Sequence, residues 1–133
     1  MGTADLGTYH RRAVQLADAM KLCQDDLPAY ASAAGLLAVH SAISYSDAVL
    51  IGLGGKRPRG EDHRQAAAAL KRACTQTRID QRGIRHLETL LSAKAEIAYG
   101  ERETTQDRIK ALCITAERFR AWSEPILRRR RGD

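Results

Sequence analysis

Apolar residues recur at steps of three and four along most of this chain, which is the spacing of one face of an α-helix. Near the beginning they form one line on such a face: Leu6, Tyr9, Ala13, Leu16, Met20 and Cys23. This line predicts a helix over residues 5–23, with Asp5 as its N-cap. The same spacing predicts further helices over residues 62–77, over residues 84–99 and from Thr104 onward.

The stretch from Leu27 to Gly55 differs from the rest because apolar and small residues occupy every face of the helix it predicts. It contains no Lys, Arg or Glu, and its one acidic residue is Asp47. A helix that is apolar all round is buried, so we expect a central helix over residues 29–53. The stretch is long enough to cross a membrane, but Asp47 and several polar residues lie in its middle, and a charge at a bilayer centre costs about 2.5–3.5 kcal/mol. We therefore predict a soluble protein with no membrane span.

Short connections between the five predicted helices favour antiparallel neighbours. The predicted fold is all-α, an up-and-down antiparallel helical bundle of four long helices plus one shorter helix, the third. Pro125 is expected to end or bend the last helix, which leaves Arg128 to Arg131 in a mobile basic tail. The 133 residues have the length of a single domain, with a core over residues 6–127 and a tail over residues 128–133.

Positive charge is concentrated in one segment. The chain has 22 Lys and Arg against 16 Asp and Glu, a formal net charge of +6. Residues 56–85 hold nine basic and three acidic residues, so this segment equals the whole surplus. Such a field attracts nucleic acid or an acidic partner protein, and the alternative is a surface that only keeps the protein soluble. The candidate binding residues are Lys56, Arg57, Arg59, Arg64, Lys71, Arg72, Arg78, Arg82 and Arg85.

Other polar groups are also candidates for a catalytic, metal or cofactor site. His40, Ser44 and Asp47 share one face of the central helix, but the chain has no nucleophile-elbow sequence, so we expect a buried hydrogen-bonded polar cluster there. Without Glu-x-x-His pairs, a phosphate-binding loop or a dinucleotide-binding glycine pattern, we predict no metal and no cofactor. The N-terminus has no signal-peptide pattern, which predicts a cytoplasmic protein. Three residues without paired spacing are expected to be reduced core thiols: Cys23, Cys74 and Cys113.

Arg57 and His63 form a second candidate, with five residues between them. Arg57 lies in the predicted basic loop and His63 at the start of the next helix. An Arg stabilises a phosphate and a His moves a proton, and cleavage of RNA by its 2′-hydroxyl requires both. The pair therefore defines an alternative, catalytic interpretation of the basic segment.

The order of the segments resembles a known family. The central helix reads HSAISYSDA from His40, a basic glycine-rich loop and His63 follow, and later segments read LLSAKAEIAY from Leu90 and AERFRAW from Ala116. Over residues 6–127 this pattern resembles the HEPN superfamily, which comprises small helical bundles of bacterial toxin–antitoxin and defence systems. The resemblance implies a helical bundle and, because HEPN proteins commonly dimerise, a homodimer.

Many HEPN proteins are metal-independent ribonucleases, with an Arg, usually a polar residue directly after it, and a His four to six positions later. The matching positions here are Lys94, Ala95 and Tyr99. Lys lacks the planar fork of Arg, and Tyr, with a pKa of about 10, is a poor proton shuttle at neutral pH. The resemblance therefore implies a non-catalytic binding module for nucleic acid or a partner protein. The alternative is a ribonuclease toxin that uses Arg57 and His63, or a site completed across a dimer.

Overall fold

The protein is described by a computed structural model, in which residues 2–55 and 64–132 are placed. These residues form five helices and contain no strand, which confirms the predicted all-α bundle. In chain order the helices are α1 (Gly2–Gln24), α2 (Leu27–Gly52), α3 (Arg64–Thr77), α4 (Ile84–Tyr99) and α5 (Gln106–Arg131). The third helix is the shortest, as predicted, with 14 residues.

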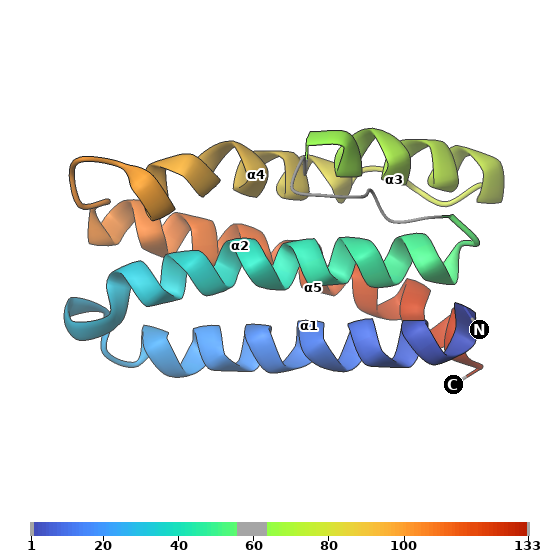
Figure 1. Ribbon diagram of the computed structural model, residues 1–133, viewed down its shortest axis with the longest axis horizontal. Coiled ribbons are helices and arrows are strands. Elements are labelled where there is room, and N and C mark those ends of the chain that lie inside the picture. Colours follow the sequence, from blue (N-terminus) through green and yellow to red (C-terminus); the bar gives the residue numbers. More distant parts are fainter. Residues whose placement is uncertain (1, 56–63, 133) are drawn as a thin grey trace.

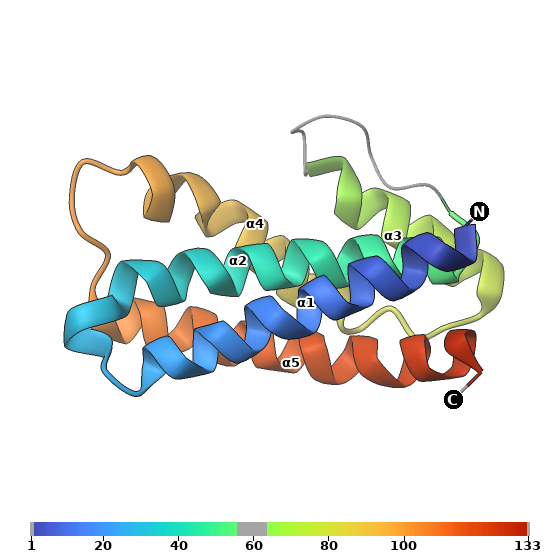
Figure 2. The same ribbon diagram turned by 60° about the horizontal axis from the view of Figure 1, so that its bottom comes forward.

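The helix α2 is the centre of the bundle and contacts each of the other four helices. It lies between α1 on one side and α3 and α4 on the other, and α5 runs along it (Figures 1 and 2). The close approach of these helices depends on small residues. At Gly35 of α2, a β-carbon would lie 2.6 Å from Cδ1 of Ile109 and 3.3 Å from Cγ2 of Ile97.

The length and composition of α2 would allow it to cross a membrane, but 67% of its most apolar 18-residue window is buried inside the bundle. Its core neighbours are large side chains from the other helices. Met20 of α1, Leu90 of α4 and Phe119 of α5 are all fully buried. Burial of this kind is what a core helix of a soluble protein shows, because its apolar surface is already covered by protein.

Several helix ends differ from the prediction. Helix α1 begins at Gly2, so Asp5 lies inside it and is not its N-cap. The last helix was predicted from Thr104 onward, but α5 begins at Gln106, and its N-cap is Thr105, whose side chain accepts a hydrogen bond from the Arg108 N–H. The prediction for α4 agrees with the structure at both ends. The residue whose side chain caps a helix sets where the helix begins. Thr104 and Thr105 are adjacent and could both cap α5, so the sequence alone does not distinguish them.

Pro125 does not end α5, and the expectation that Arg128 to Arg131 form a mobile tail beyond the helix is wrong. The helix continues through Pro125 to Arg131 and ends at Gly132, which has a left-handed backbone with φ of 80°. A proline inside a helix loses one hydrogen bond, but Ile126 and Leu127 directly after it are buried in the core. Their packing keeps the chain helical and carries four arginines along the end of the bundle.

Candidate anion-binding cleft

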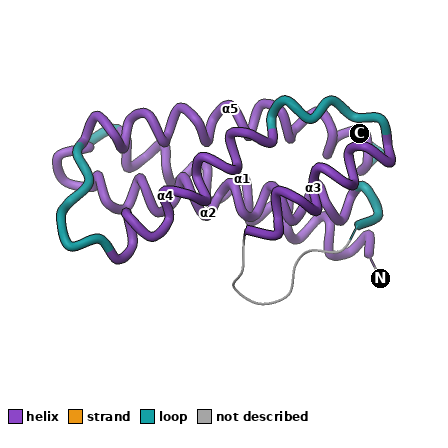
Figure 3. Tube along the Cα trace, turned by 90° about the horizontal axis from the view of Figure 1, so that it is seen from above, coloured by secondary structure: helices purple, strands orange, loops and turns teal. Residues whose placement is uncertain are grey.

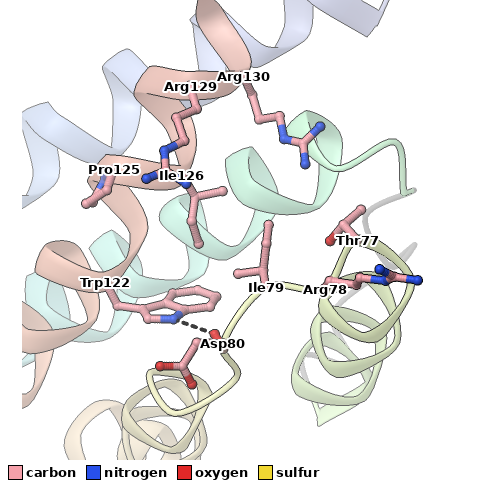
Figure 4. A pocket seen from close by; sticks show the side chains of 9 residues that line it. All are labelled: Thr77, Arg78, Ile79, Asp80, Trp122, Pro125, Ile126, Arg129 and Arg130. Carbon is pink, nitrogen blue, oxygen red and sulfur yellow. Dashed lines mark hydrogen bonds between the residues drawn. The ribbon is translucent and has the colours of Figure 1, made fainter.

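A cleft of about 570 Å³ lies between the connection of α3 and α4 and the C-terminal part of α5 (Figure 4). Figure 3 shows this connection beside the C-terminal end of the chain. Its apolar lining comes from Ile79 in the connection and from Trp122 and Ile126 of α5. Its charged lining includes Arg78 from the connection, together with two arginines from the last turns of α5. An apolar floor beside several arginines is a surface for an anion that also carries a flat or apolar part.

Trp122 holds the two sides of the cleft together. Its ring stacks on Phe119 at a centroid distance of 5.5 Å, and its indole Nε1 donates a hydrogen bond of 2.9 Å to the backbone carbonyl of Asp80. The ring also lies directly against Gly83, where any side chain would overlap it. These contacts attach the α3–α4 connection to α5 and fix the orientation of the indole.

Arg78 has a left-handed backbone, with φ of 59°, and it is the one non-glycine residue with a positive φ among those described. It ends α3 in a Schellman motif, because the Ile79 N–H bonds to the Cys74 carbonyl at 2.9 Å and the Arg78 N–H to the Thr75 carbonyl at 3.4 Å. Glycine is the usual residue at this position, since a β-carbon there costs about 1–2 kcal/mol. The chain therefore keeps an arginine at a position where glycine would be more stable.

The arginines of α5 enter the cleft from one end of the helix. Arg129 and Arg130 extend from α5 beside the cleft, and Arg78 extends on its opposite side (Figure 4). The stem of Arg130 packs over Gly52, whose missing side chain leaves it room. Within the described ranges, the guanidinium groups of Arg78, Arg129 and Arg130 form no ion pair, and Figure 4 shows Arg78 at the edge of the cleft with its side chain extending away from Trp122.

Asp80 is the one acidic residue of the described lining, and its charge is already paired. Its carboxylate accepts a bond of 2.9 Å from the backbone N–H of Arg82 and one of 2.8 Å from Nε of the same residue. These two hydrogen bonds hold the pKa of Asp80 below its ordinary value. The carboxylate is therefore ionised, and it is no source of protons for chemistry at neutral pH. The lining supports binding of an anion rather than acid–base catalysis.

Among the described residues, the members of the predicted basic segment are spread over α3, the α3–α4 connection and α4. Lys56, Arg57, Arg59 and His63 lie outside the described residues, and Arg64 is the first residue of α3. Two other members are engaged elsewhere, because Lys71 pairs with Glu88 and Arg82 with Asp80. The remaining members of the segment are exposed helix residues, Arg72 and Arg85, and the cleft residue Arg78.

Sequence reasoning missed Trp122, Arg129 and Arg130 as parts of a site. A signal for them exists, since positions seven and eight residues apart lie on the same face of a helix. Because the helix was expected to end or bend at Pro125, Arg129 and Arg130 were not expected to share a helix face with Trp122. The structure restores it by continuing α5 to Arg131.

The expectation of a buried polar cluster at His40, Ser44 and Asp47 is wrong for His40, which is exposed on α2. Ser44 is buried and Asp47 is half-buried, so helical spacing did place them toward the interior. Partial burial and the nearby charge of Lys94 lower the pKa of His40, which therefore lies toward α4. Among the described residues, this side of α2 is partly exposed to solvent, whereas the sequence pattern predicted burial of every face of the helix.

A different buried polar network joins three helices. The Tyr45 hydroxyl donates a short hydrogen bond of 2.6 Å to Oε2 of Glu124, and Nε2 of His10 lies 2.9 Å from the same oxygen. Burial alone would raise the pKa of Glu124, but the hydrogen bonds from Tyr45 and His10 outweigh it and hold this pKa below its ordinary value. Burial raises the pKa of Tyr45, and the bond to Glu124 raises it further.

The three positions at which the sequence was compared with the HEPN motif lie on α4, outside the cleft lining. Lys94 is half-buried, Ala95 is exposed, and Tyr99 is 82% exposed near the end of the helix. In the part of the chain that the structure describes, no group of three or more His, Cys, Asp and Glu side chains is arranged to hold a metal. No protein-family model matches this chain, and no curated protein sequence matches it.

Proposed function

We propose that this protein is a non-catalytic nucleic-acid-binding module that holds a single strand in the cleft between the α3–α4 connection and α5. The observation that carries the proposal is a single cleft whose lining combines Trp122 with three arginines that form no ion pair among the described residues. Proteins that bind single strands combine positive charge along the backbone with aromatic rings on which bases stack. The cleft supplies both components, with Arg78, Arg129 and Arg130 for phosphates and Trp122 for a base.

The backbone of Arg78 supports this proposal. Residues in sparsely populated conformations cluster at ligand sites, because selection for stability alone would remove them. Glycine would relieve the strain at position 78 but would also remove one of the three guanidinium groups. Retention of arginine there is what a binding role for the cleft predicts.

The proposed module belongs with the HEPN-like proteins that the sequence resembles, as a non-catalytic member of a bacterial defence or toxin–antitoxin system in the cytoplasm. In this proposal the described part of the basic segment and the end of α5 act together on one nucleic acid. A homodimer would bring two such surfaces onto one particle. Light scattering at micromolar concentration tests that arrangement, because a mass near 14.7 kDa identifies a monomer.

The binding test uses the one tryptophan of the chain as its reporter. A short single-stranded RNA is titrated into the protein while intrinsic fluorescence and the anisotropy of a label on the RNA are recorded. We expect saturable binding that quenches Trp122, since a stacked base lies against the indole. The logarithm of the binding constant should fall with the logarithm of salt concentration by about 0.7 for each phosphate contacted.

Arg129→Gln and Arg128→Gln form a matched pair, because both arginines lie in the last turns of α5 and only Arg129 lines the cleft. We expect Arg129→Gln to weaken binding several-fold and to reduce the salt slope, whereas Arg128→Gln changes both much less. Binding that leaves Trp122 fluorescence unchanged, or equal losses in the two variants, would refute the cleft as the site. The RNA should remain intact throughout. Cleavage that His63→Ala abolishes would instead establish the ribonuclease alternative with Arg57 and His63.

A further inference from the structure

We infer that a second anion-binding pocket, specific for a phosphate group, lies between the beginning of α1 and the end of α5. The pocket has a volume of about 260 Å³ and is lined by His10, Arg11, Val14, Gln15 and Arg131. Both ends of the chain lie at the same end of the bundle, where these helices meet (Figure 1). The pocket shares no lining residue with the cleft that contains Trp122.

Two guanidinium groups of this lining converge over Gly7 of α1. Nη1 of Arg11 lies 3.2 Å and Nη2 of Arg131 lies 4.0 Å from the point that a β-carbon of Gly7 would occupy. Across the described residues, neither guanidinium forms an ion pair with an acidic side chain. Two like charges that approach one point without a counter-charge form a site for an anion, and guanidinium groups match the oxygens of a phosphate.

The buried network described above holds Arg131 in position. Nη1 of Arg131 lies 3.0 Å from Nδ1 of His10. Because a guanidinium only donates hydrogen bonds, Nδ1 must be the acceptor, and the ring proton of His10 must be on Nε2. That proton faces Oε2 of Glu124 at 2.9 Å, and the Tyr45 hydroxyl donates to the same oxygen. This chain fixes the neutral tautomer of His10, which in turn directs the fork of Arg131.

Among the described residues, the other N–H groups of the Arg131 side chain have no partner, and Arg11 supplies a second fork from α1. A tetrahedral phosphate can bridge the two forks, because each offers donors on the side that faces Gly7. The same chemistry would hold inorganic phosphate or the terminal phosphate of a nucleic-acid strand. This inference does not rest on strand binding in the Trp122 cleft, and each can be refuted without the other.

The test follows the His10 ring nitrogens and the Arg131 side-chain Nε–H by NMR in the full-length protein. Inorganic phosphate is titrated at constant ionic strength, with chloride replaced as phosphate is added. We expect saturable shifts at Arg131 and at His10, while Trp122 stays unchanged. A parallel titration compares a 5′-phosphorylated oligonucleotide with the same strand carrying a 5′-hydroxyl. Tighter binding of the phosphorylated strand would identify a nucleic-acid terminus as the source, and equal binding would identify the free anion.

The variant Arg11→Gln is the decisive one, because Arg11 is exposed and takes no part in the buried network, so its loss should leave the fold intact. We expect it to weaken phosphate binding at least tenfold. Arg12→Gln, its exposed neighbour outside the pocket lining, should have little effect. Gly7→Ala should also weaken binding, since its methyl group displaces the Arg11 guanidinium. Shifts that do not saturate, or equal effects of Arg11→Gln and Arg12→Gln, would overturn the inference.

Discussion

The indole ring of Trp122 occupies the space that a side chain of Gly83 would need. Gly83 itself has an ordinary right-handed backbone, with φ of −70° and ψ of −20°, so space and not conformation requires glycine there. We therefore predict that Gly83→Ala costs about 1–3 kcal/mol of unfolding free energy through overpacking, and that it displaces the indole. Urea denaturation followed by Trp122 fluorescence measures both effects.

Gly7→Ala is the control for this prediction. Its new methyl group would meet only the flexible ends of two side chains, Arg11 at 3.2 Å and Arg131 at 4.0 Å. Inside a helix, alanine is more stable than glycine by about 0.5–1 kcal/mol, so this variant should gain stability. A Gly83→Ala protein as stable as the original, with an unchanged emission maximum, would contradict the packing described for the cleft.

Replacement of Arg78 by glycine should stabilise the protein while it weakens RNA binding. The left-handed backbone at position 78 costs an L-residue about 1 kcal/mol or more, and glycine avoids that cost. Arg72→Gly is the matched control, because Arg72 lies exposed inside α3, where glycine should cost roughly 1 kcal/mol. The two substitutions remove the same side chain and should shift the denaturation midpoint in opposite directions. A loss of stability in both would show that the Arg78 side chain has a structural role.

The half-buried Glu124 should make stability depend on acid. Its pKa in the folded state lies below the ordinary value of 4.5, so the folded state binds its proton less readily than the unfolded chain. The stabilisation is fully present above this ordinary value and is lost as pH falls from there through the folded pKa. We expect a smaller loss of stability between about pH 5 and pH 3 in Glu124→Gln than in the original protein, measured by urea denaturation at each pH.

Tyr45→Phe tests the same network without a change of formal charge. It removes the hydroxyl that donates to Glu124 at 2.6 Å. We expect a cost of about 1–3 kcal/mol at neutral pH, because the half-buried carboxylate loses one of its donors, and a weaker dependence on acid. Glu101→Gln, which changes an exposed carboxylate, should leave the acid dependence unaltered. An acid dependence that is the same in Tyr45→Phe and in the original protein would contradict the role of this bond.

The three cysteines should differ in reactivity. Burial raises the pKa of the Cys113 thiol to about 11 and raises that of Cys74 as well, whereas Cys23 is half-buried. A thiol reacts as its thiolate, so Cys113 should stay unmodified by a disulfide reagent at pH 8 in the folded protein. Mass spectrometry after brief labelling should find the modification at Cys23 first. Rapid labelling of Cys113 would indicate local opening between α2 and α5.

The helices could be predicted because their apolar spacing is local information. The continuous apolar surface of α2 predicted its central position, and the limits of α4 at Ile84 and Tyr99 follow from the same periodicity. Pro125 shows where local rules fail. Its effect on the backbone is visible in the sequence, but the burial of Ile126 and Leu127 that overrides it depends on contacts with other helices.

The candidate site was predictable only in part for the same reason. The basic character of residues 56–85 indicated Arg78, but its neighbours in the cleft come from α5, more than 40 positions further along the chain. The turn at residues 78–83 that brings them together is held by the bond from Trp122 to the Asp80 carbonyl. The partner of the indole is a backbone carbonyl, which every residue has. The residue type at that position therefore gives no sign of the pairing in the sequence.

The order of the arginines at the end of α5 has a consequence for how this surface can change. Successive helix residues project about 100° apart, so Arg130 enters the cleft while Arg131 reaches His10. Because four arginines follow one another, one alanine inserted after Leu127 would move Arg128, Arg129 and Arg130 onto the helical positions that Arg129, Arg130 and Arg131 now occupy. Deletion of one arginine would instead leave no arginine at the position that now reaches His10. The run therefore tolerates a shift of register in one direction only, and insertions of one residue should be tolerated there better than deletions.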